Sequence, residues 1–442
     1  MYIRKVIIMG AGGRDFHNFN IVFRNNPNYK VIAFTAAQIP GIEMKRYPPS
    51  LAGSLYPSGI PIYPEEKLVE LIKLFKVDEV VLSYSDLTYE DIGRKLSMVL
   101  AAGATFKILG PDETMIPSFK PVIAITAVRT GAGKSTVSRA VIKELLERGI
   151  KPAIVRHPMA YGDLERAIVQ IFENIKDFDK YGTTIEEREE YEPYVKMGLT
   201  VLAGVDYEKV LLEAEKRGDV ILWDGGNNDW PFFRPNYMIT VADAMRPGQE
   251  IHSFPGEVNV RMANAVIVNK ISQAKSEDVN TVVRNIKAIN PKAHIVKADM
   301  EVYVEKPSLI SGKKVVIVED SPSVTHGGLP YGAGYVAAKK YNVSEIVDPR
   351  PYAKGIIKKM YEEYPHMGPV IPSTGYTLEQ LRDLENTLNA VDADVIILGT
   401  PADITRLINV NKPVIHVKYE LKVLEGPSIA ELIEEFLEKV KT

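Results

Sequence analysis

Residues 126–136 read Thr-Ala-Val-Arg-Thr-Gly-Ala-Gly-Lys-Ser-Thr, and they decide how the rest of the chain is interpreted. The apolar run Val122–Val128 predicts a buried strand, and Val137–Arg148 predicts a helix directly after the segment. Between them, Gly131 and Gly133 let backbone N–H groups face a phosphate chain, and the helix start adds its positive end. A glycine-rich turn of purely structural use is the alternative, but this order of elements favours nucleotide binding.

The side chains of this loop fit a Mg²⁺-bound triphosphate. Lys134 is predicted to reach the terminal phosphates, and the Ser135 hydroxyl to ligate Mg²⁺. The predicted ATP contacts from the loop are Arg129, Thr130, Gly131, Ala132, Gly133, Lys134, Ser135 and Thr136. Val128 stands where the standard loop has its first glycine, so the layout resembles the deviant loop of the SIMIBI class of NTPases. That class has a signature lysine early in the loop. The resemblance implies that Arg129, in its place, touches phosphates, and it favours a homodimer.

Two further strand ends are predicted to serve the nucleotide. Asp224 ends the apolar run 219–224 and is predicted to hold the metal through a water; the alternative is a carboxylate that caps a turn. Asn269 and Lys270 end the run 265–270, where related NTPases read the base, and an Asn amide can pair with adenine. Ser272 stands where a guanine-reading carboxylate is usual, which favours ATP; an ordinary strand end is the alternative.

A second site for a polyanion is predicted after the strand Ala153–Val155. Arg156, His157 and Tyr161 offer donors there, and Asp163 is a candidate for handling a metal ion or a proton. A polar surface loop is the alternative. Arg246 follows another strand and is predicted either to clamp a phosphate or to form a surface ion pair.

Glycine-rich turns near both ends of the chain are weaker candidates. The first contains Gly12 and Gly13 with Arg14 and His17, and the second, 321–334, contains Thr325 and His326. Both could bind phosphate or substrate oxygens, or be structural turns. No acidic residue closes the strand near position 35, so NAD is not expected. The acidic segment 185–194 is predicted to be mostly a solvated helix face.

Strand-like and helix-like runs alternate along almost the whole chain, which predicts an α/β protein with mainly parallel sheets. We expect a central P-loop domain at 121–312 between Rossmann-like domains at 1–120 and 313–442. The chain has 442 residues, a net charge of −3 and no cysteine, which argues against a broad nucleic-acid-binding surface and excludes thiolate chemistry. No apolar run is long enough to cross a membrane and no signal peptide is visible, so we expect a cytoplasmic protein.

Five segments together resemble the archaeal cyclic 2,3-diphosphoglycerate synthetase family. They are GAGGRD at 10–15, TAVRTGAGKST at 126–136, RHPMAYGDL at 156–164, EDSPSVTHGGLPYGAG at 319–334 and GTPAD at 399–403. The resemblance implies an ATP-dependent enzyme that closes 2,3-diphosphoglycerate into an intramolecular phosphoanhydride and releases ADP and phosphate. Catalysis would rest on Lys134, Arg129 and Asp163. A switch or metallochaperone-like NTPase and a 2-phosphoglycerate kinase are the alternatives.

Overall fold

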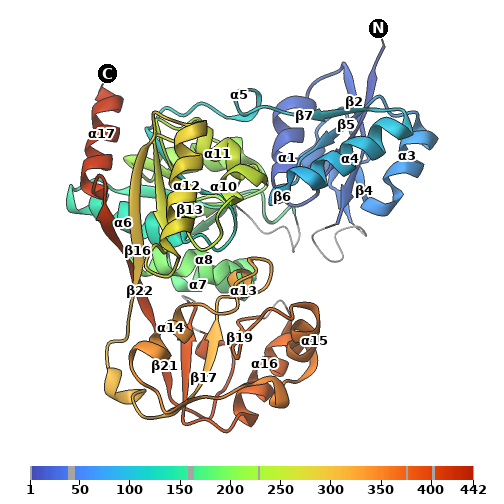
Figure 1. The fold of residues 1–442 in the computed structure, drawn as a ribbon. Coiled ribbons are helices and arrows are strands. Elements are labelled where there is room, and N and C mark those ends of the chain that lie inside the picture. Colours follow the sequence, from blue (N-terminus) through green and yellow to red (C-terminus); the bar gives the residue numbers. More distant parts are fainter. Residues whose placement is uncertain are drawn as a thin grey trace.

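The computed structural model describes residues 2–37, 45–157, 164–226, 229–374, 377–400 and 404–441, apart from the side chains at 185–186. Its strands form three main sheets, each covered by helices, in an α/β arrangement (Figure 1). The mixed α/β class with parallel sheets is therefore confirmed.

The first domain is built on a sheet of order β3-β4-β2-β1-β5-β7. Its strands are β1 (Arg4–Met9), β2 (Tyr29–Ala36), β3 (Arg46–Tyr47), β4 (Ile60–Pro64), β5 (Glu79–Leu82) and β7 (Thr105–Ile108). Its helices are α1 (Arg14–Asn18), α2 (Pro49–Ala52), α3 (Leu68–Phe75), α4 (Tyr89–Ala102) and α5 (Pro111–Thr114). All neighbours except β3 and β4 run parallel, as predicted for a Rossmann-like domain. A short strand β6 (Leu87–Thr88) leaves this sheet and pairs with β14 (Ser253–Phe254) of the central domain.

The central sheet has the order β10-β11-β9-β12-β8-β13-β15-β16-β22. Its strands are β8 (Val122–Ala127), β9 (Pro152–Val155), β10 (Gln170–Phe172), β11 (Val201–Ala203), β12 (Val220–Trp223), β13 (Tyr237–Asp243), β15 (Ala265–Asn269), β16 (His294–Tyr303) and β22 (Lys418–Glu425). Its helices are α6 (Lys134–Glu147), α7 (Ile175–Tyr181), α8 (Ile185–Lys196), α9 (Tyr207–Glu215), α10 (Gln249–His252), α11 (Gly256–Met262), α12 (Ser276–Ile289) and α17 (Ile429–Lys441). Strand β8 lies between β12 and β13, parallel to both.

The core explains why β8 reads as one apolar run. Ile123 and Ile125 pack on the face covered by α6 and α17, while Val122 and Ala124 pack on the opposite face. Successive side chains of a strand point to opposite faces, so a strand covered on both faces must be apolar at every position.

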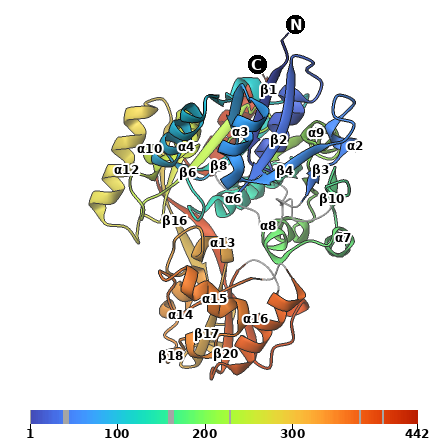
Figure 2. The ribbon, with the colours of Figure 1, turned by 90° about the vertical axis from the view of Figure 1, so that its right-hand side faces the viewer.

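The third domain has a parallel sheet of order β18-β17-β20-β21, with β19 beside β17 (Figure 2). Its strands are β17 (Lys314–Glu319), β18 (Glu345–Ile346), β19 (Ile371–Pro372), β20 (Val395–Gly399) and β21 (Val414–His416). Its helices are α13 (Ser321–Val324), α14 (Ala333–Lys340), α15 (Gly355–Glu363) and α16 (Leu378–Ala390).

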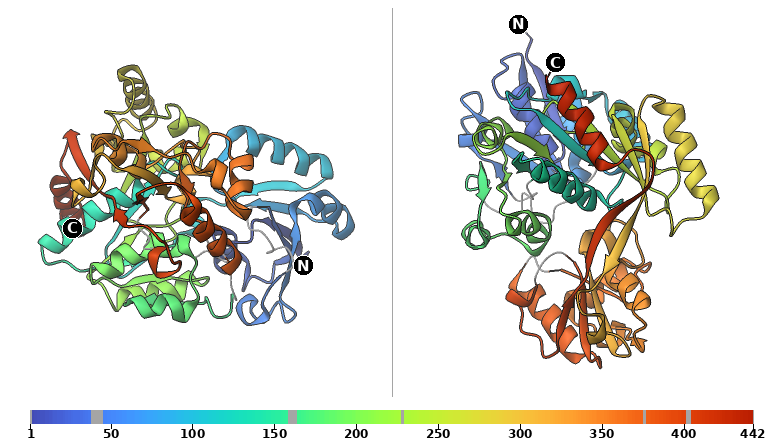
Figure 3. Two further views of the ribbon diagram at one scale, coloured as in Figure 1. Left: turned by 90° about the horizontal axis from the view of Figure 1, so that it is seen from below. Right: turned by 90° about the vertical axis from the view of Figure 1, so that its left-hand side faces the viewer.

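The predicted block 313–442 is divided in the structure. The chain leaves the central domain along β16 and returns along β22, which pairs antiparallel with β16 from Tyr303↔Lys418 to Lys297↔Glu425 (Figure 3). Helix α17 then packs on the central core through Leu432, Ile433 and Phe436. The predicted block is divided because the apolar stripe of α17 completes one face of the central sheet. Local sequence does not reveal this long-range packing. No helix among the described residues has the length and apolarity needed to span a bilayer.

Candidate active site

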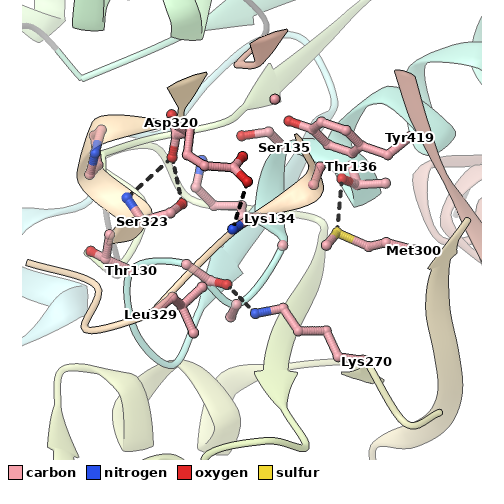
Figure 4. A pocket seen from close by; sticks show the side chains of 18 of the residues that line it. Thr130, Lys134, Ser135, Thr136, Lys270, Met300, Asp320, Ser323, Leu329 and Tyr419 are labelled. Carbon is pink, nitrogen blue, oxygen red and sulfur yellow. Dashed lines mark hydrogen bonds between the residues drawn. The ribbon is translucent and has the colours of Figure 1, made fainter. Parts of the chain in front are cut away.

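A cavity opens between the segment after β8 and the third domain. Its lining includes all of the residues Arg129–Thr136 from the central domain. The opposite wall comes from the third domain and includes Asp320, Ser323 and Leu329, with Tyr419 of β22 at one side (Figure 4). The predicted phosphate loop is thus one wall of a cavity whose other wall belongs to a different domain.

The loop backbone has the bend that its glycines predict. Gly131 and Gly133 have φ values of +83° and +105°, in the left-handed region. A Cβ on Gly133 would lie 2.2 Å from Nδ2 of Asn269, so glycine is required there for space as well as for conformation.

Three side chains hold three consecutive carbonyls of the loop. Arg246 donates to the Thr130 oxygen at 2.9 Å, Lys270 to the Gly131 oxygen at 2.6 Å, and Asn269 to the Ala132 oxygen at 2.9 Å. A buried carboxylate, Asp243, accepts from Lys270 at 2.8 Å and from Arg246 at 2.9 Å.

These contacts show that the three side chains support the loop backbone. Asn269 and Lys270, predicted to read the base, are buried, although Lys270 also lines the cavity, and burial lowers the pKa of Lys270. Arg246, predicted to clamp a phosphate, reaches past the loop to the Gly327 carbonyl of the third domain at 2.5 Å. These bonds hold the C=O groups of Thr130, Gly131 and Ala132 in place and so fix the bend of the loop.

The lysine of the loop is held by a buried carboxylate. Nζ of Lys134 lies 2.5 Å from Asp224, which also accepts from Arg156 at 2.5 Å, from Ser138 at 2.9 Å and from the Tyr194 hydroxyl. Burial opposes the charge on Asp224, but the charges of Arg156 and Lys134 outweigh it and hold the pKa of that carboxyl well below its ordinary value. Burial lowers the pKa of Lys134.

Arg156 is therefore part of the support beneath the loop. It is 1% exposed, and it bridges Asp224 to Glu190. The cavity lining includes neither Arg156 nor Asp224, although both were predicted at its surface. Tyr161 and Asp163 lie outside the described residues.

The first glycine-rich turn lies at the interface between the first and central domains, apart from the cavity lining. Asp15 accepts from the N–H groups of Gly12 at 2.8 Å and Gly13 at 3.0 Å, so a side chain of the chain itself occupies that turn. A Cβ on Gly13 would lie 1.8 Å from Nε2 of His157. This predicted substrate residue therefore packs against the turn.

Arg14 and His17 are also buried in this interface. Arg14 pairs with Asp229, donates to the Trp230 carbonyl at 2.6 Å and stacks over the Trp230 ring at 4.0 Å. His17 stacks on Phe232 with ring centroids 4.1 Å apart. Burial and the charge of Arg14 lower the pKa of His17 to about 3, so its ring is neutral at ordinary pH.

The wall opposite the phosphate loop is acidic. Glu319 ends β17, Asp320 caps α13, and Glu189 and Glu190 come from α8. Among the described lining residues, the third domain contributes no lysine or arginine. We call these four carboxylates the acidic wall. Sequence reasoning missed all four.

The prediction of a solvated face for 185–194 was wrong for much of the segment. Glu189 is 3% exposed and accepts from Thr400 of the third domain at 2.6 Å, and also from Ser373. Tyr191 and Tyr194 are buried in the central core. This stripe of tyrosines at helical spacing is the signal that could have identified a buried helix.

Glu319 is held by backbone groups. It accepts N–H groups of Gly332 at 3.0 Å, Gly334 at 3.1 Å and Tyr335 at 2.8 Å. Burial raises its pKa to about 7 despite these bonds. Burial also raises the pKa of Asp320, whose carboxylate accepts from Ser323 Oγ at 2.5 Å.

The other predicted residues of the third domain lie off the cavity. Thr325 is buried and donates to the Ser321 carbonyl at 2.7 Å, while His326 is exposed and lies 3.3 Å from the Tyr364 hydroxyl. The same loop does reach the cavity through Leu329, Tyr331 and Gly332.

The described residues fit a metal that arrives with a nucleotide. They contain no cluster of three or more His, Asp or Glu side chains that could hold an ion alone. Mg²⁺ is usually bound through few protein ligands plus substrate phosphates, and the Ser135 hydroxyl lines the cavity where one such ligand is needed.

Comparison with known proteins gives two relatives. The chain is 53% identical over 433 residues to arginine synthetase ArcE of Thermococcus kodakarensis, covering 98% of this chain and 97% of that protein. It is 24% identical over 302 residues to a cyclic 2,3-diphosphoglycerate synthetase of Thermococcus sibiricus, covering 60% of this chain and 66% of that protein. No family model matches. The predicted resemblance to the second family is thus confirmed only as a distant relationship.

Solved structures resemble the chain weakly. The ATP complex of LpxK from Aquifex aeolicus covers 84% of this chain and 99% of its own, with a TM-score of 0.43 and 12% identity. The MinC:MinD cell division complex of Aquifex aeolicus covers 50% of this chain and 92% of its own, with a TM-score of 0.24 and 19% identity. Neither score supports an argument about this chain.

Proposed function

The chain belongs to the family of arginine synthetase ArcE, and from that relationship we propose that it is an ATP-dependent synthetase that forms arginine. The phosphate loop supports ATP as the energy source, because residues Arg129–Thr136, with Lys134 among them, line one wall of the cavity. This assignment replaces 2,3-diphosphoglycerate as our preferred substrate.

The chemistry of such a loop restricts the precursor of arginine. A loop of this kind directs the γ-phosphoryl group, which is transferred to an oxygen atom. The amino acid that carries an oxygen in place of one guanidino nitrogen of arginine is citrulline. Transfer to its ureido oxygen activates the carbon; ammonia then forms the C–N bond, the C–O bond breaks, and phosphate leaves while the nitrogen loses its excess proton. The sum is citrulline, ammonia and ATP giving arginine, ADP and phosphate.

The acidic wall is the observation that carries this assignment. Arginine has a guanidinium group that stays charged at every ordinary pH, and carboxylates are its usual partners. Asp320 and Glu319 face the cavity from the third domain, and no described cation from that domain lies beside them. A cationic product is therefore attracted to this side of the cavity.

A bisphosphate would meet the opposite situation. Two phosphate groups placed against Glu319 and Asp320 would be repelled, and Arg156, predicted to neutralise them, is buried and already paired with Asp224 and Glu190. Cyclic 2,3-diphosphoglycerate synthesis remains the second candidate because one relative bears that name.

The residues of the loop have separable roles in this proposal. Lys134 would leave Asp224 to neutralise charge on the transferred phosphoryl group, and Arg156 would keep Asp224 compensated. Ser135 would provide the protein ligand to Mg²⁺, which neutralises the phosphate chain when bound. Positioning and charge stabilisation supply the acceleration in such transfers.

The test is a parallel assay of the purified protein with ATP and Mg²⁺. One arm contains citrulline and ammonium, and amino-acid chromatography measures arginine while an enzymatic assay measures ADP. The other arm contains 2,3-diphosphoglycerate, and ³¹P NMR detects a cyclic phosphoanhydride. We expect arginine and ADP in equal amounts in the first arm and no cyclic product in the second. Cyclic product without arginine would overturn the proposal.

A further inference from the structure

The phosphate loop is contacted by a residue of the first domain. Oδ1 of Asp86 lies 3.1 Å from Nε of Arg129, and Oδ2 accepts from the Thr130 hydroxyl at 3.3 Å. Asp86 stands between β5 and β6, and Arg129 lines the cavity. The two charged groups lie 43 positions apart in the sequence and come from different sheets.

The geometry of this pair leaves the useful end of the guanidinium open. Asp86 engages Nε, while no described residue bonds to the two terminal nitrogens of Arg129. A carboxylate that binds Nε restricts the plane of the guanidinium, and the terminal N–H groups remain as a fork that matches phosphate oxygens. Arg129 lines the cavity, whereas Asp86 is not among the lining residues.

The backbone around Asp86 is anchored to the base of the loop. Leu87 and Thr88 pair with Phe254 and Ser253, and the Ser253 hydroxyl donates at 2.7 Å to the carbonyl of Val128, directly before Arg129. Asp86 has a φ of +63°, in the left-handed region that aspartate adopts more readily than most residues.

We propose that Asp86 is a positioning residue for phosphoryl transfer, which acts by orienting Arg129 toward the phosphate chain. The inference rests on the proposed use of ATP. It gives the first domain a role in catalysis: without Asp86, Arg129 would lose the carboxylate that its Nε contacts. Asp86 itself is not among the residues that line the cavity.

The test is steady-state kinetics of Asp86→Asn, with Asp86→Glu as the conservative variant. Asparagine keeps the shape of the side chain but loses the charge, so we expect kcat to fall about tenfold while KM for ATP changes less than threefold. Asp86→Glu should recover part of kcat. Asp112→Asn is the matched control, because this carboxylate of the same domain is 98% exposed, and it should equal the wild type.

A double variant separates positioning from general support. Lysine at 129 has no Nε fork to orient, so adding Asp86→Asn to Arg129→Lys should cause less than a twofold further loss in single-turnover rate. Additive losses, or an Asp86→Asn variant within twofold of wild-type kcat, would overturn the inference. If the wild-type protein turns over no ATP with any of the tested substrates, the proposed function fails. If the wild-type protein is active and Asp86→Asn is equally active, only the inference about Asp86 fails.

Discussion

The two walls of the cavity are built in opposite ways. One wall is the phosphate loop with Lys134, whose carbonyls are held by Arg246, Lys270 and Asn269. The other is the acidic wall, in which Glu319 is itself held by three N–H groups. One wall suits anions and the other suits cations. The proposed synthetase, which would transfer a phosphoryl group from ATP and release a cationic product, would use both.

The largest effect is expected when the lysine of the phosphate loop is removed. Lys134→Ala should lower the rate of ADP formation by about a thousandfold or more, because it removes the charge that is proposed to neutralise the transferred phosphoryl group. Arg156, Ser138 and Tyr194 still compensate Asp224, so circular dichroism and the melting temperature should change little. Lys143→Ala, on the exposed side of the same helix, is the control. Retained turnover would remove the loop from the mechanism.

The next effect concerns the acidic wall. Asp320→Asn keeps the cap of α13, because Asn caps a helix about as well as Asp. It removes one charge from the acidic wall, and we expect arginine to bind about thirtyfold more weakly while ATP binding changes less than twofold. Isothermal titration calorimetry measures both. Asp392→Asn, at an exposed position, should change neither, and equal weakening of both ligands would contradict the division between the walls.

A smaller effect tests how the loop is supported. Lys270→Met removes the bond to the Gly131 carbonyl and one of the partners of buried Asp243, so we expect nucleotides to bind about tenfold more weakly and the protein to lose about 2 kcal/mol of stability. Because Lys270 holds backbone, ATP and GTP should be affected equally. A selective loss for one base in fluorescence titrations would instead restore the predicted base-reading role.

The smallest effect is a pH dependence of arginine binding at the acidic wall. The pKa of Glu319 is raised to about 7, so this carboxyl is mostly neutral at pH 6 and mostly ionised at pH 8. The arginine guanidinium is charged throughout that range, so arginine affinity should rise with pH, by about tenfold between pH 6 and 8. Glu319→Gln should bind arginine more weakly with little dependence on pH. Calorimetric titrations at three pH values check both statements.

Local patterns predicted the position and the bend of the phosphate loop. The segment 126–136 follows a buried strand and precedes α6 as predicted, and Gly131 and Gly133 have the left-handed φ values that its bend requires. This prediction rests on residues adjacent in sequence. Such features are visible without knowledge of the rest of the fold.

The acidic wall could not be predicted in the same way. Glu189 lies in a run of charges that resembles a solvated face, and it is buried only because Ser373 and Thr400, 184 and 211 residues away, approach it. Arg156 was predicted to bind substrate, but it is paired with Asp224 and Glu190, 68 and 34 residues away. Pairings of this length depend on how domains meet, which no local pattern encodes.

The paired strands β16 and β22 have a consequence for how such enzymes diversify. Tyr303 and Lys418 face each other across the ribbon, so the entire third domain hangs from two neighbouring points of the backbone. A tight hairpin joining these points would delete that module in one step, and a different insertion there would supply a new recognition wall. The central domain and its phosphate loop would stay unchanged while the domain that binds the second substrate was replaced. Relatives could in this way share one nucleotide site and act on different substrates.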